Sequence, residues 1–242
     1  MTEILSLLGV NKSFGAVTVA DGLSYALNEG EALGVIGPNG AGKTTMFNLI
    51  TGTLPPDDGR IDFLGQNVTS TRAAQRCRMG LARSFQVPQP FGGLSVFENA
   101  MVAATQAAGL SGHGAERLCL DVLEQTGLLE KANIPAGKLA LLDRKRLELS
   151  RALCAKPKLL LLDEIAGGLT EAECQVLVRT IKAIHGTGMS IIWIEHVVHA
   201  LLAVVTRLIV IDFGKMIAEG DPRTVMDSRQ VKEIYLGIEV DG

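Results

Sequence analysis

The residues with the clearest chemistry form one short glycine-rich segment. Residues 37–44 read Gly-Pro-Asn-Gly-Ala-Gly-Lys-Thr, which matches the pattern G-x-x-x-x-G-K-[ST]. Glycines let backbone N–H groups turn toward a triphosphate, and the N-terminus of a following helix adds partial positive charge. Lys43 is placed to reach the β- and γ-phosphates, and the Thr44 hydroxyl is placed to bind Mg²⁺. The segment predicts a nucleoside triphosphate site built from Gly37, Pro38, Asn39, Gly40, Ala41, Gly42, Lys43, Thr44 and Thr45.

A pair of adjacent carboxylates provides the second chemical signal. Residues 159–164 read Leu-Leu-Leu-Leu-Asp-Glu, an apolar strand that ends in two acids. Ligands of open α/β sheets bind at the carboxyl ends of the strands, so both side chains are expected beside the phosphates. Asp163 can hold the Mg²⁺ that bridges the phosphates, and Glu164 can polarise an attacking water. With the loop at 37–44, this pair predicts hydrolysis of the triphosphate.

Three other candidates are weak when each is considered alone. His196 follows the apolar run 191–194, and a histidine after a strand is usually a surface or capping residue. Gln86 follows the apolar–polar run 81–85 and is unremarkable by itself. Phe14, considered alone, would be interpreted as an ordinary core aromatic. His196 would join the carboxylates only if its strand neighbours the strand of Asp163.

The elements that must position these residues alternate between strands and helices. We expect strands at 4–10, 22–27, 32–36 and 60–64, with a helix after the glycine-rich loop. The middle is helical, at 95–108, 115–126 and 143–155. Strands at 159–162, 191–194 and 207–212 then alternate with helices at 171–184 and 197–205. This order predicts an α/β fold with a mostly parallel sheet and a helical insertion between Gln86 and Lys158.

Composition excludes several classes of protein. The 242 residues are 47% hydrophobic and 20% charged, which suits a globular domain with a large core. The net charge of −3 argues against a basic nucleic-acid-binding surface and against a polybasic membrane anchor. No apolar run approaches the ~20 residues that span a bilayer, and the start does not read as a signal peptide. The four widely spaced cysteines predict reduced thiols.

The order of these motifs resembles the ATP-binding-cassette (ABC) ATPases along nearly the whole chain. In that resemblance Phe14 is the aromatic that stacks on adenine, and residues 37–44 and 159–164 are the Walker A and Walker B motifs. Gln86 falls at the glutamine that contacts Mg²⁺ and the attacking water, and His196 at the histidine that holds the γ-phosphate. The resemblance implies one P-loop NTPase (RecA-like) domain over 1–242. It has a nucleotide-binding core at 1–86 and 158–237, an antiparallel N-terminal β subdomain and a helical subdomain at 87–157.

Three further segments are similar to one branch of the family. They are Ala82-Arg83-Ser84-Phe85-Gln86, Ser95-Val96-Phe97-Glu98-Asn99-Ala100 and Ile234-Tyr235-Leu236-Gly237. That branch contains ATPase subunits of importers for branched-chain and other hydrophobic amino acids. The similarity implies permease subunits as partners, a solute-binding protein indirectly, and a peripheral position on the cytoplasmic face of the inner or plasma membrane. The segment 87–92 is the expected docking groove, although an ordinary surface loop remains an alternative.

One family motif is altered. Where the family has a signature close to L-S-G-G-Q, this chain has Leu139-Ala140-Leu141-Leu142-Asp143. Ala140 has no hydroxyl to donate, Leu141 and Leu142 replace glycines, and Asp143 is expected to cap the next helix. Because family members pair head to tail around ATP, we expect a heterodimer in which a second ABC ATPase supplies an intact signature. Thr170, near the end of the segment after Walker B, keeps a hydroxyl that could bond across that interface.

Other functions remain open at this stage. One is a low-turnover, nucleotide-sensing regulatory subunit, which the altered signature favours and intact Glu164 and His196 oppose. Another is an importer ATPase for a different small solute, such as an amide or urea. A third is an ATPase acting on DNA or ribosomes. The sequence disfavours it, because the net charge is not basic and there is no long coiled-coil insertion.

Overall fold

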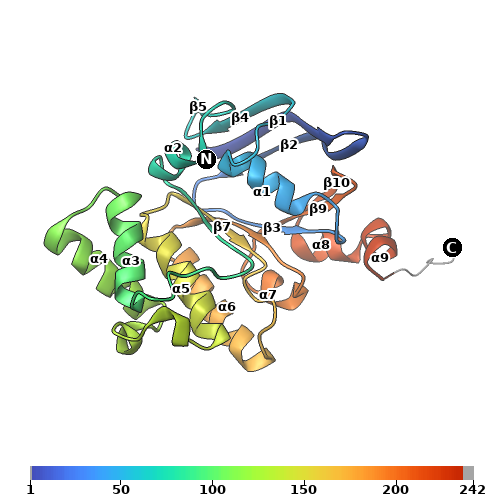
Figure 1. Ribbon diagram of the computed structural model, residues 1–242. Coiled ribbons are helices and arrows are strands. Elements are labelled where there is room, and N and C mark those ends of the chain that lie inside the picture. Colours follow the sequence, from blue (N-terminus) through green and yellow to red (C-terminus); the bar gives the residue numbers. More distant parts are fainter. Residues whose placement is uncertain (1, 237–242) are drawn as a thin grey trace.

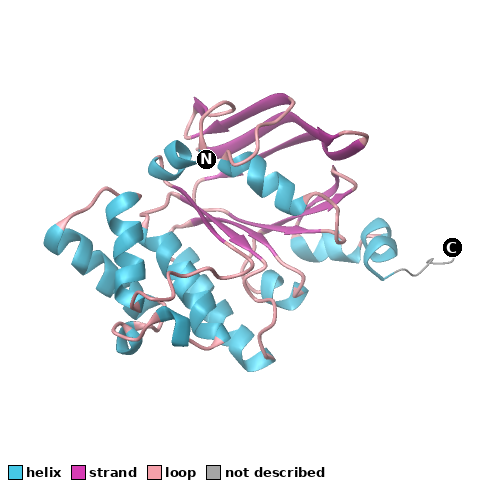
Figure 2. Cartoon of the chain, viewed as in Figure 1, coloured by secondary structure: helices cyan, strands magenta, loops and turns pink. Residues whose placement is uncertain are grey.

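Two β-sheets with a helix between them form the centre of the molecule (Figure 1). The computed structural model describes residues 2–236. The larger sheet has six strands in the order β10-β9-β3-β8-β7-β6, and the smaller has four in the order β2-β1-β4-β5. Figure 2 shows the strands gathered in these two layers, with helices around the larger sheet. The predicted α/β fold with an antiparallel N-terminal sheet is confirmed.

The larger sheet is parallel except at one edge. Its strands are β3 (Ala32–Ile36), β6 (Leu81–Ser84), β7 (Leu159–Asp163), β8 (Ser190–Ile194), β9 (Arg207–Asp212) and β10 (Lys215–Gly220). Every residue of β3, β7 and β8 is buried, as continuous apolar strands covered on both faces should be. The predicted strand at 207–212 is present as β9, and the strand that follows it, β10, was not predicted and pairs antiparallel with β9. Phe213 and Gly214 both have positive φ, which suits the tight turn that joins two antiparallel strands.

The smaller sheet is antiparallel and longer than its apolar runs indicated. Its strands are β1 (Glu3–Phe14), β2 (Val17–Asn28), β4 (Asp58–Phe63) and β5 (Gln66–Asn67). The β1–β2 hairpin extends past the predicted ends at residues 10 and 22, and Phe14 pairs with Val17 beside its turn. Apolar patterning missed this extension because the residues near the hairpin tip are exposed.

The predicted helices are all present near their expected positions, and residues 2–236 contain three more, at 73–78, 222–227 and 229–236, that were not predicted. The helices are α1 (Lys43–Thr51), α2 (Ala73–Arg78), α3 (Val96–Gln106), α4 (Gly112–Gln125), α5 (Leu141–Cys154), α6 (Glu171–His185), α7 (Val198–Leu202), α8 (Pro222–Asp227) and α9 (Arg229–Leu236), with 3₁₀ turns at Leu129–Lys131 and Ala136–Lys138. Capping boxes at Ser95 and Thr170 begin α3 and α6. Helix α7 is shorter than the predicted 197–205. Among residues 2–236, no helix is both long and apolar enough to cross a bilayer.

Two apolar clusters on opposite faces of the larger sheet hold these layers together. Leu159 and Leu161 of β7 face the cluster that contains α1 and the smaller sheet. Leu160 and Leu162 face the cluster that contains α5, α6 and α7. This period of two follows from the alternation of side chains along a strand. Because both faces are packed, the carboxyl ends of the strands are held in fixed positions, and those ends carry the predicted site.

Candidate functional site

The predicted site residues come from loops at the carboxyl ends of four neighbouring parallel strands. The glycine-rich loop follows β3, Gln86 follows β6, Glu164 follows β7 and His196 follows β8. The strands lie in the order β3-β8-β7-β6 and pair in parallel, so all four loops emerge at one edge of the sheet. This edge is where open α/β sheets bind ligands. His196 was expected to join the carboxylates only if its strand neighbours the strand of Asp163. This condition is met, because β7 and β8 are paired.

The glycine-rich loop is tightly packed against its neighbours. Gly42 has a φ of 102°, and a Cβ atom there would lie 2.3 Å from the carbonyl oxygen of Val19. A Cβ atom at Gly37 would lie 2.0 Å from the carbonyl oxygen of Ile211. Both positions therefore require glycine. Helix α1 begins directly after Gly42 with no acidic residue in its first turn, which leaves its positive end available to an anion.

Lys43 lies inside this loop rather than extended into solvent. Its side chain is buried, and Nζ donates hydrogen bonds to the carbonyl oxygens of Gly37 (2.6 Å) and Pro38 (2.9 Å). Burial lowers the pKa of Lys43, while the nearby carboxylates of Glu164 and Asp163 oppose that shift. The ammonium group is therefore held within the loop, in electrostatic range of the two carboxylates.

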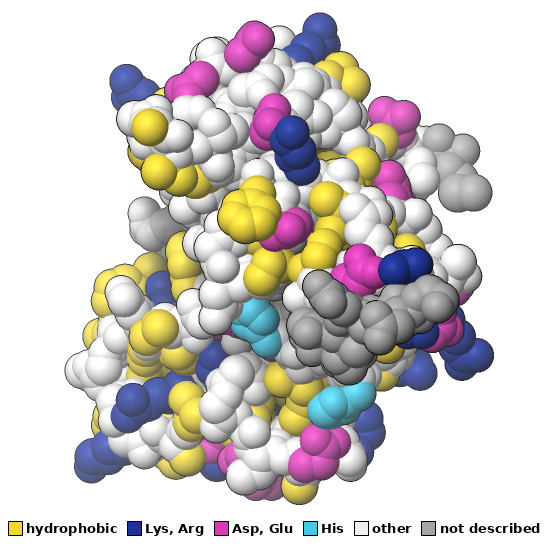
Figure 3. Space-filling model, turned by 90° about the vertical axis from the view of Figure 1, so that its right-hand side faces the viewer, with side chains coloured by type: hydrophobic (Ala, Val, Ile, Leu, Met, Phe, Trp, Pro, Cys, Tyr) yellow, Lys and Arg dark blue, Asp and Glu magenta, His cyan; other side chains and the backbone are white. Residues whose placement is uncertain are grey.

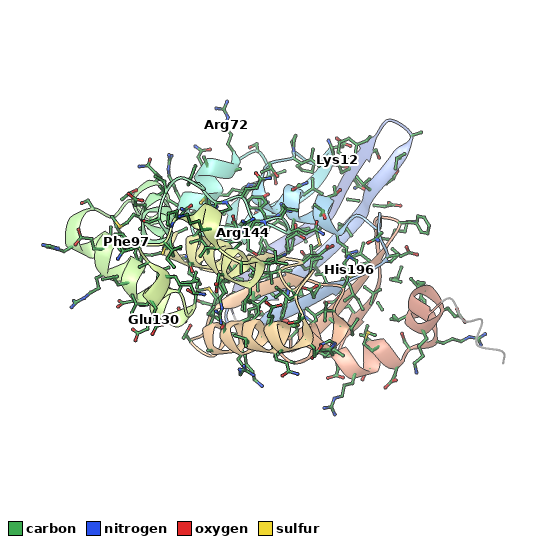
Figure 4. All side chains as sticks on the ribbon, turned by 60° about the horizontal axis from the view of Figure 1, so that its bottom comes forward. Lys12, Arg72, Phe97, Glu130, Arg144 and His196 are labelled. Carbon is green, nitrogen blue, oxygen red and sulfur yellow. The ribbon has the colours of Figure 1, made fainter. Side chains whose placement is uncertain are left out.

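The three predicted catalytic side chains meet around Glu164. Gln86 Nε2 donates a hydrogen bond to one carboxylate oxygen of Glu164. His196 Nε2 lies 2.8 Å from the other oxygen. Figure 4 shows all side chains, with His196 labelled in the central part of the molecule. Glu164 also has a φ of 45°, a strained value for a residue with a Cβ atom, and such strain is concentrated at functional sites.

Asp163 is held by a partner that the sequence did not identify as a site residue. Arg83 Nη2 lies 2.5 Å from Asp163 Oδ2, and both side chains are almost fully buried. Arg83 also donates to Asn48 Oδ1 (2.7 Å), and its guanidinium lies over the rings of Phe47 and Phe85. Arg83 belongs to the Ala82–Gln86 segment, which resembles one branch of the family and is the one indication of Arg83 in the sequence. Its carboxylate partner is 80 residues away, so only the tertiary structure reveals the ion pair.

The predicted Mg²⁺ ligands fit a hard cation. Thr44, Gln86 and Asp163 line one cleft of ≈ 480 Å³. Within residues 2–236, the Oδ1 atom of Asp163 is buried without a hydrogen-bond partner. A hydroxyl, an amide oxygen and a carboxylate oxygen with an unused lone pair are the ligand types that Mg²⁺ prefers, usually with waters. The residues present therefore suit this metal.

A second buried carboxylate organises the main chain around the site. Glu195 accepts hydrogen bonds from the backbone N–H of Ala166 (3.0 Å) and of His196 (3.0 Å). It thereby ties the turn after Glu164 to the loop that carries His196. No pattern in the sequence identified Glu195 as a site residue.

Phe14 lies at the tip of the β1–β2 hairpin with half of its surface exposed. Val19, on the other strand of this hairpin, lies against Gly42, so the hairpin borders the glycine-rich loop. Lys12 Nζ is 5.7 Å from the centre of the Phe14 ring. The ring is therefore an exposed aromatic surface near the glycine-rich loop, and Phe14 is not the core residue that its residue type suggests.

The altered segment Leu139–Asp143 begins helix α5, and the predicted cap is wrong. The helix starts at Leu141 with Ala140 at the N-cap, so Asp143 lies within the first turn. Its buried carboxylate pairs with Lys131 and with Arg146 (3.2 Å). Thr170 caps helix α6 and bonds Glu173 within the chain, so its hydroxyl is already engaged.

Comparisons with known proteins agree with this geometry. The family described as ABC transporter matches residues 20–167. The chain is 36% identical to the high-affinity branched-chain amino acid transport ATP-binding protein LivG of Salmonella typhimurium, over 97% of this chain and 98% of that protein. It is 31% identical to the corresponding BraF protein of Pseudomonas aeruginosa, with the same coverage.

Solved structures match over almost the full length. The ADP conformation of an ATP-binding cassette of an ABC transporter has a TM-score of 0.90 and 29% identity, covering 98% of this chain and 100% of that one. A nucleotide-free cassette from an ABC transporter gives a TM-score of 0.89 with 30% identity. With the glycine-rich loop and the carboxylates at one sheet edge, these matches show that the chain belongs to the ABC transporter family and is one of its ATPases.

Proposed function

We propose that this chain is the ATP-hydrolysing subunit that energises an importer for branched-chain or other hydrophobic amino acids. The observation that carries the proposal is the meeting of Gln86, Glu164 and His196 beside a complete phosphate loop. The solute class is supported by the relatives LivG and BraF, which are named for branched-chain amino acid transport. As in the resemblance, the subunit works at the cytoplasmic face of the inner or plasma membrane, bound to permeases.

Each site residue has a defined task in this proposal. Glu164 is the general base for the attacking water, and His196 and Gln86 orient that water and the γ-phosphate. The backbone of residues 37–45 and Lys43 bind the phosphates, and Phe14 stacks on adenine. Mg²⁺, held by Thr44, Asp163 and Gln86, supplies positive charge against the phosphates when it is bound. Both oxygens of the Glu164 carboxylate contact Gln86 or His196, so Glu164 can accept a proton from water only when one of these contacts loosens.

A groove next to the site suits a permease segment. It has a volume of ≈ 290 Å³ and lies between the sheet and the helices α3 and α5. Its walls include Leu81, Phe85, Phe91 and Val102, and Arg151 lies over the ring of Phe91. A short amphipathic helix of a permease would bury its apolar face here. Because Phe85 and Phe91 flank the segment after Gln86, movement of the helical region 87–157 would reach the catalytic trio.

The proposed assembly contains a second, different ABC ATPase. The altered segment Leu139–Asp143 begins α5 with two leucines and a negative charge, a poor environment for another chain's γ-phosphate. The partner therefore supplies an intact signature to the ATP bound at this chain's Lys43. This chain offers an impaired signature in return, so the two ATP sites differ in turnover.

Reconstitution tests this function. We would co-purify the chain with the permeases and second ATPase encoded beside it, and place the complex in liposomes with the solute-binding protein. ATP-dependent uptake of leucine, with no uptake of urea or a short amide, is the expected result. Uptake of urea or the amide without uptake of leucine would show that the proposed solute class is wrong. Purification with nucleic acid instead of permeases would contradict the proposal. On the face shown in Figure 3, basic side chains are scattered among acidic and apolar ones.

A second candidate is a low-turnover regulatory subunit, which the altered signature favours. The intact trio around Glu164 favours hydrolysis instead. Turnover by the assembled complex separates the two, because a regulatory chain would bind ATP while its own site released no phosphate.

A further inference from the structure

Lys145 is a buried cation that touches the main chain of two site residues. Its side chain lies one helical turn after the start of α5 and is 3% exposed. Its Nζ atom donates to the backbone carbonyl of Gln86 (2.7 Å) and lies 3.3 Å from that of Glu164. One ammonium group from the helical layer therefore joins the loop after β6 to the loop after β7. Figure 4 labels its neighbour Arg144 on the same helix.

The backbone of Glu164 needs such support. Its positive φ is strained, and residues in such conformations persist only when their surroundings hold them in place. The N–H of Glu164 donates to the carbonyl of Ile194 (2.8 Å), and its carbonyl accepts from the N–H of Gly167 (3.2 Å). Lys145 is the side chain that adds a charged donor to that carbonyl. The orientation of the Glu164 carboxylate depends on these bonds.

The charge of Lys145 is balanced by its surroundings. Burial lowers its pKa, and the carboxylates of Glu195, Glu164, Asp163 and Glu148 oppose that shift. These groups come from the loop after β8, from the end of β7 and from α5 itself, so acids face the ammonium from several elements. In the described residues its hydrogen bonds go to carbonyls, so its role is to fix main-chain positions.

We propose that Lys145 is a positioning residue that clamps the backbones of Gln86 and Glu164 in register for hydrolysis and couples them to helix α5. The coupling to α5 rests on the proposed function, because the start of that helix faces the partner ATPase. The clamp itself rests only on the observed contacts. When the helical region shifts, the bonds from Lys145 move Gln86 and Glu164 together.

The test compares Lys145→Met with Lys145→Gln. Methionine keeps length and apolar bulk but has no donor, whereas glutamine keeps one N–H donor without charge. We expect Lys145→Met to lower kcat for ATP about 10- to 100-fold, because small misplacements of catalytic groups have effects of that size. The KM for ATP should stay within about twofold, since the phosphate loop is untouched. Lys145→Gln should recover part of the loss.

A double-mutant cycle separates positioning from general damage. If Lys145 acts through the Gln86 side chain as well as through Glu164, then Lys145→Met should lower kcat by a smaller factor in a Gln86→Ala background than in the wild type. Arg76→Lys is the matched control, because Arg76 is another buried cation that donates to main-chain carbonyls, those of Leu49 and Ile50, away from the site. It should lower the melting temperature while leaving kcat per folded molecule unchanged.

Hydrogen exchange tests the clamp without turnover. Amides of residues 85–89 and 164–167 should exchange faster in Lys145→Met and Lys145→Gln than in the wild type, and Arg76→Lys should leave them unchanged. Unchanged exchange in these segments, or equal losses of kcat in the wild-type and Gln86→Ala backgrounds, would overturn the inference. Neither readout requires amino acid import, so failure of the proposed transport function would be seen separately.

Discussion

The starts of helices α1 and α5 have the same helical backbone, but the side chains in their first turns are of opposite charge. Helix α1 begins after Gly42, has no acid in its first turn and carries Lys43. Helix α5 begins after Ala140 and has Leu141, Leu142 and Asp143 in its first turn, with Asp143 paired to Lys131 and Arg146. The first N–H groups of any α-helix have no partner within the helix, and its N-terminus carries a positive partial charge. The comparison indicates that a helix N-terminus can bind phosphate only when small residues let the phosphate approach the backbone and no negative side chain repels it.

The largest expected effect concerns which ATP site of the proposed heterodimer hydrolyses. Replacing Glu164 with Gln should lower turnover of the complex about 10²- to 10⁴-fold while ATP still binds, because a general base contributes about that much. Phosphate release and ATP binding are measured on the same preparation. Survival of activity, together with its loss after the equivalent change in the partner, would show that the working site belongs to the partner chain.

The next change attempts to convert α5 into a phosphate-binding end. The triple variant Ala140→Ser, Leu141→Gly and Leu142→Gly restores a hydroxyl and removes the side chains that hold a phosphate away. Made together with Glu164→Gln, it should raise the residual turnover at least about tenfold, since a donor to a developing negative charge is worth about 10²–10³ in rate. Ala140→Ser alone is the control and should do less. No rise would mean that the partner's own ATP site is limited elsewhere.

Asp143 gives a smaller effect, on stability. Asp143→Asn removes a buried charge from two ion pairs and should lower the free energy of unfolding by about 1–3 kcal/mol. Lys131→Met, at a side chain that is 43% exposed, should cost at most about 1 kcal/mol. Denaturant midpoints of both variants measure this. Equal losses would indicate that Arg146 contributes little and that the segment is held mainly by its leucines.

Phe14 gives the smallest effect. Because the ring is half exposed, Phe14→Ala should remove about 1 kcal/mol of stacking and raise the KM for ATP about fivefold, with kcat unchanged. Steady-state kinetics at varied ATP separate the two parameters. A fall in kcat instead would place the ring in the hydrolytic step rather than in base binding.

Segments that carry strong local signals were predicted well from the sequence. Strands β3, β7 and β8 are short apolar runs, and their burial on both faces of a sheet explains why such runs have no alternation. Strand β10 and the ends of the β1–β2 hairpin were missed because their residues are largely exposed or half-buried, so patterning there is weak. The cap assigned to Asp143 failed because the helix begins at Leu141, and the N-cap position is taken by Ala140, which has no side-chain oxygen.

The sequence by itself determined the phosphate loop, because its glycines, Lys43 and Thr44 are contiguous and one strand–turn–helix unit presents them all. It also determined that Asp163 ends a buried strand and that Glu164 follows it. Only the tertiary structure decided that Gln86 and His196 meet Glu164, since Gln86 and Glu164 are 78 residues apart and meet through the pairing of neighbouring parallel strands. The same holds for Arg83 on Asp163 and Lys145 on two carbonyls, because a buried cation finds its partners through packing and not through sequence spacing.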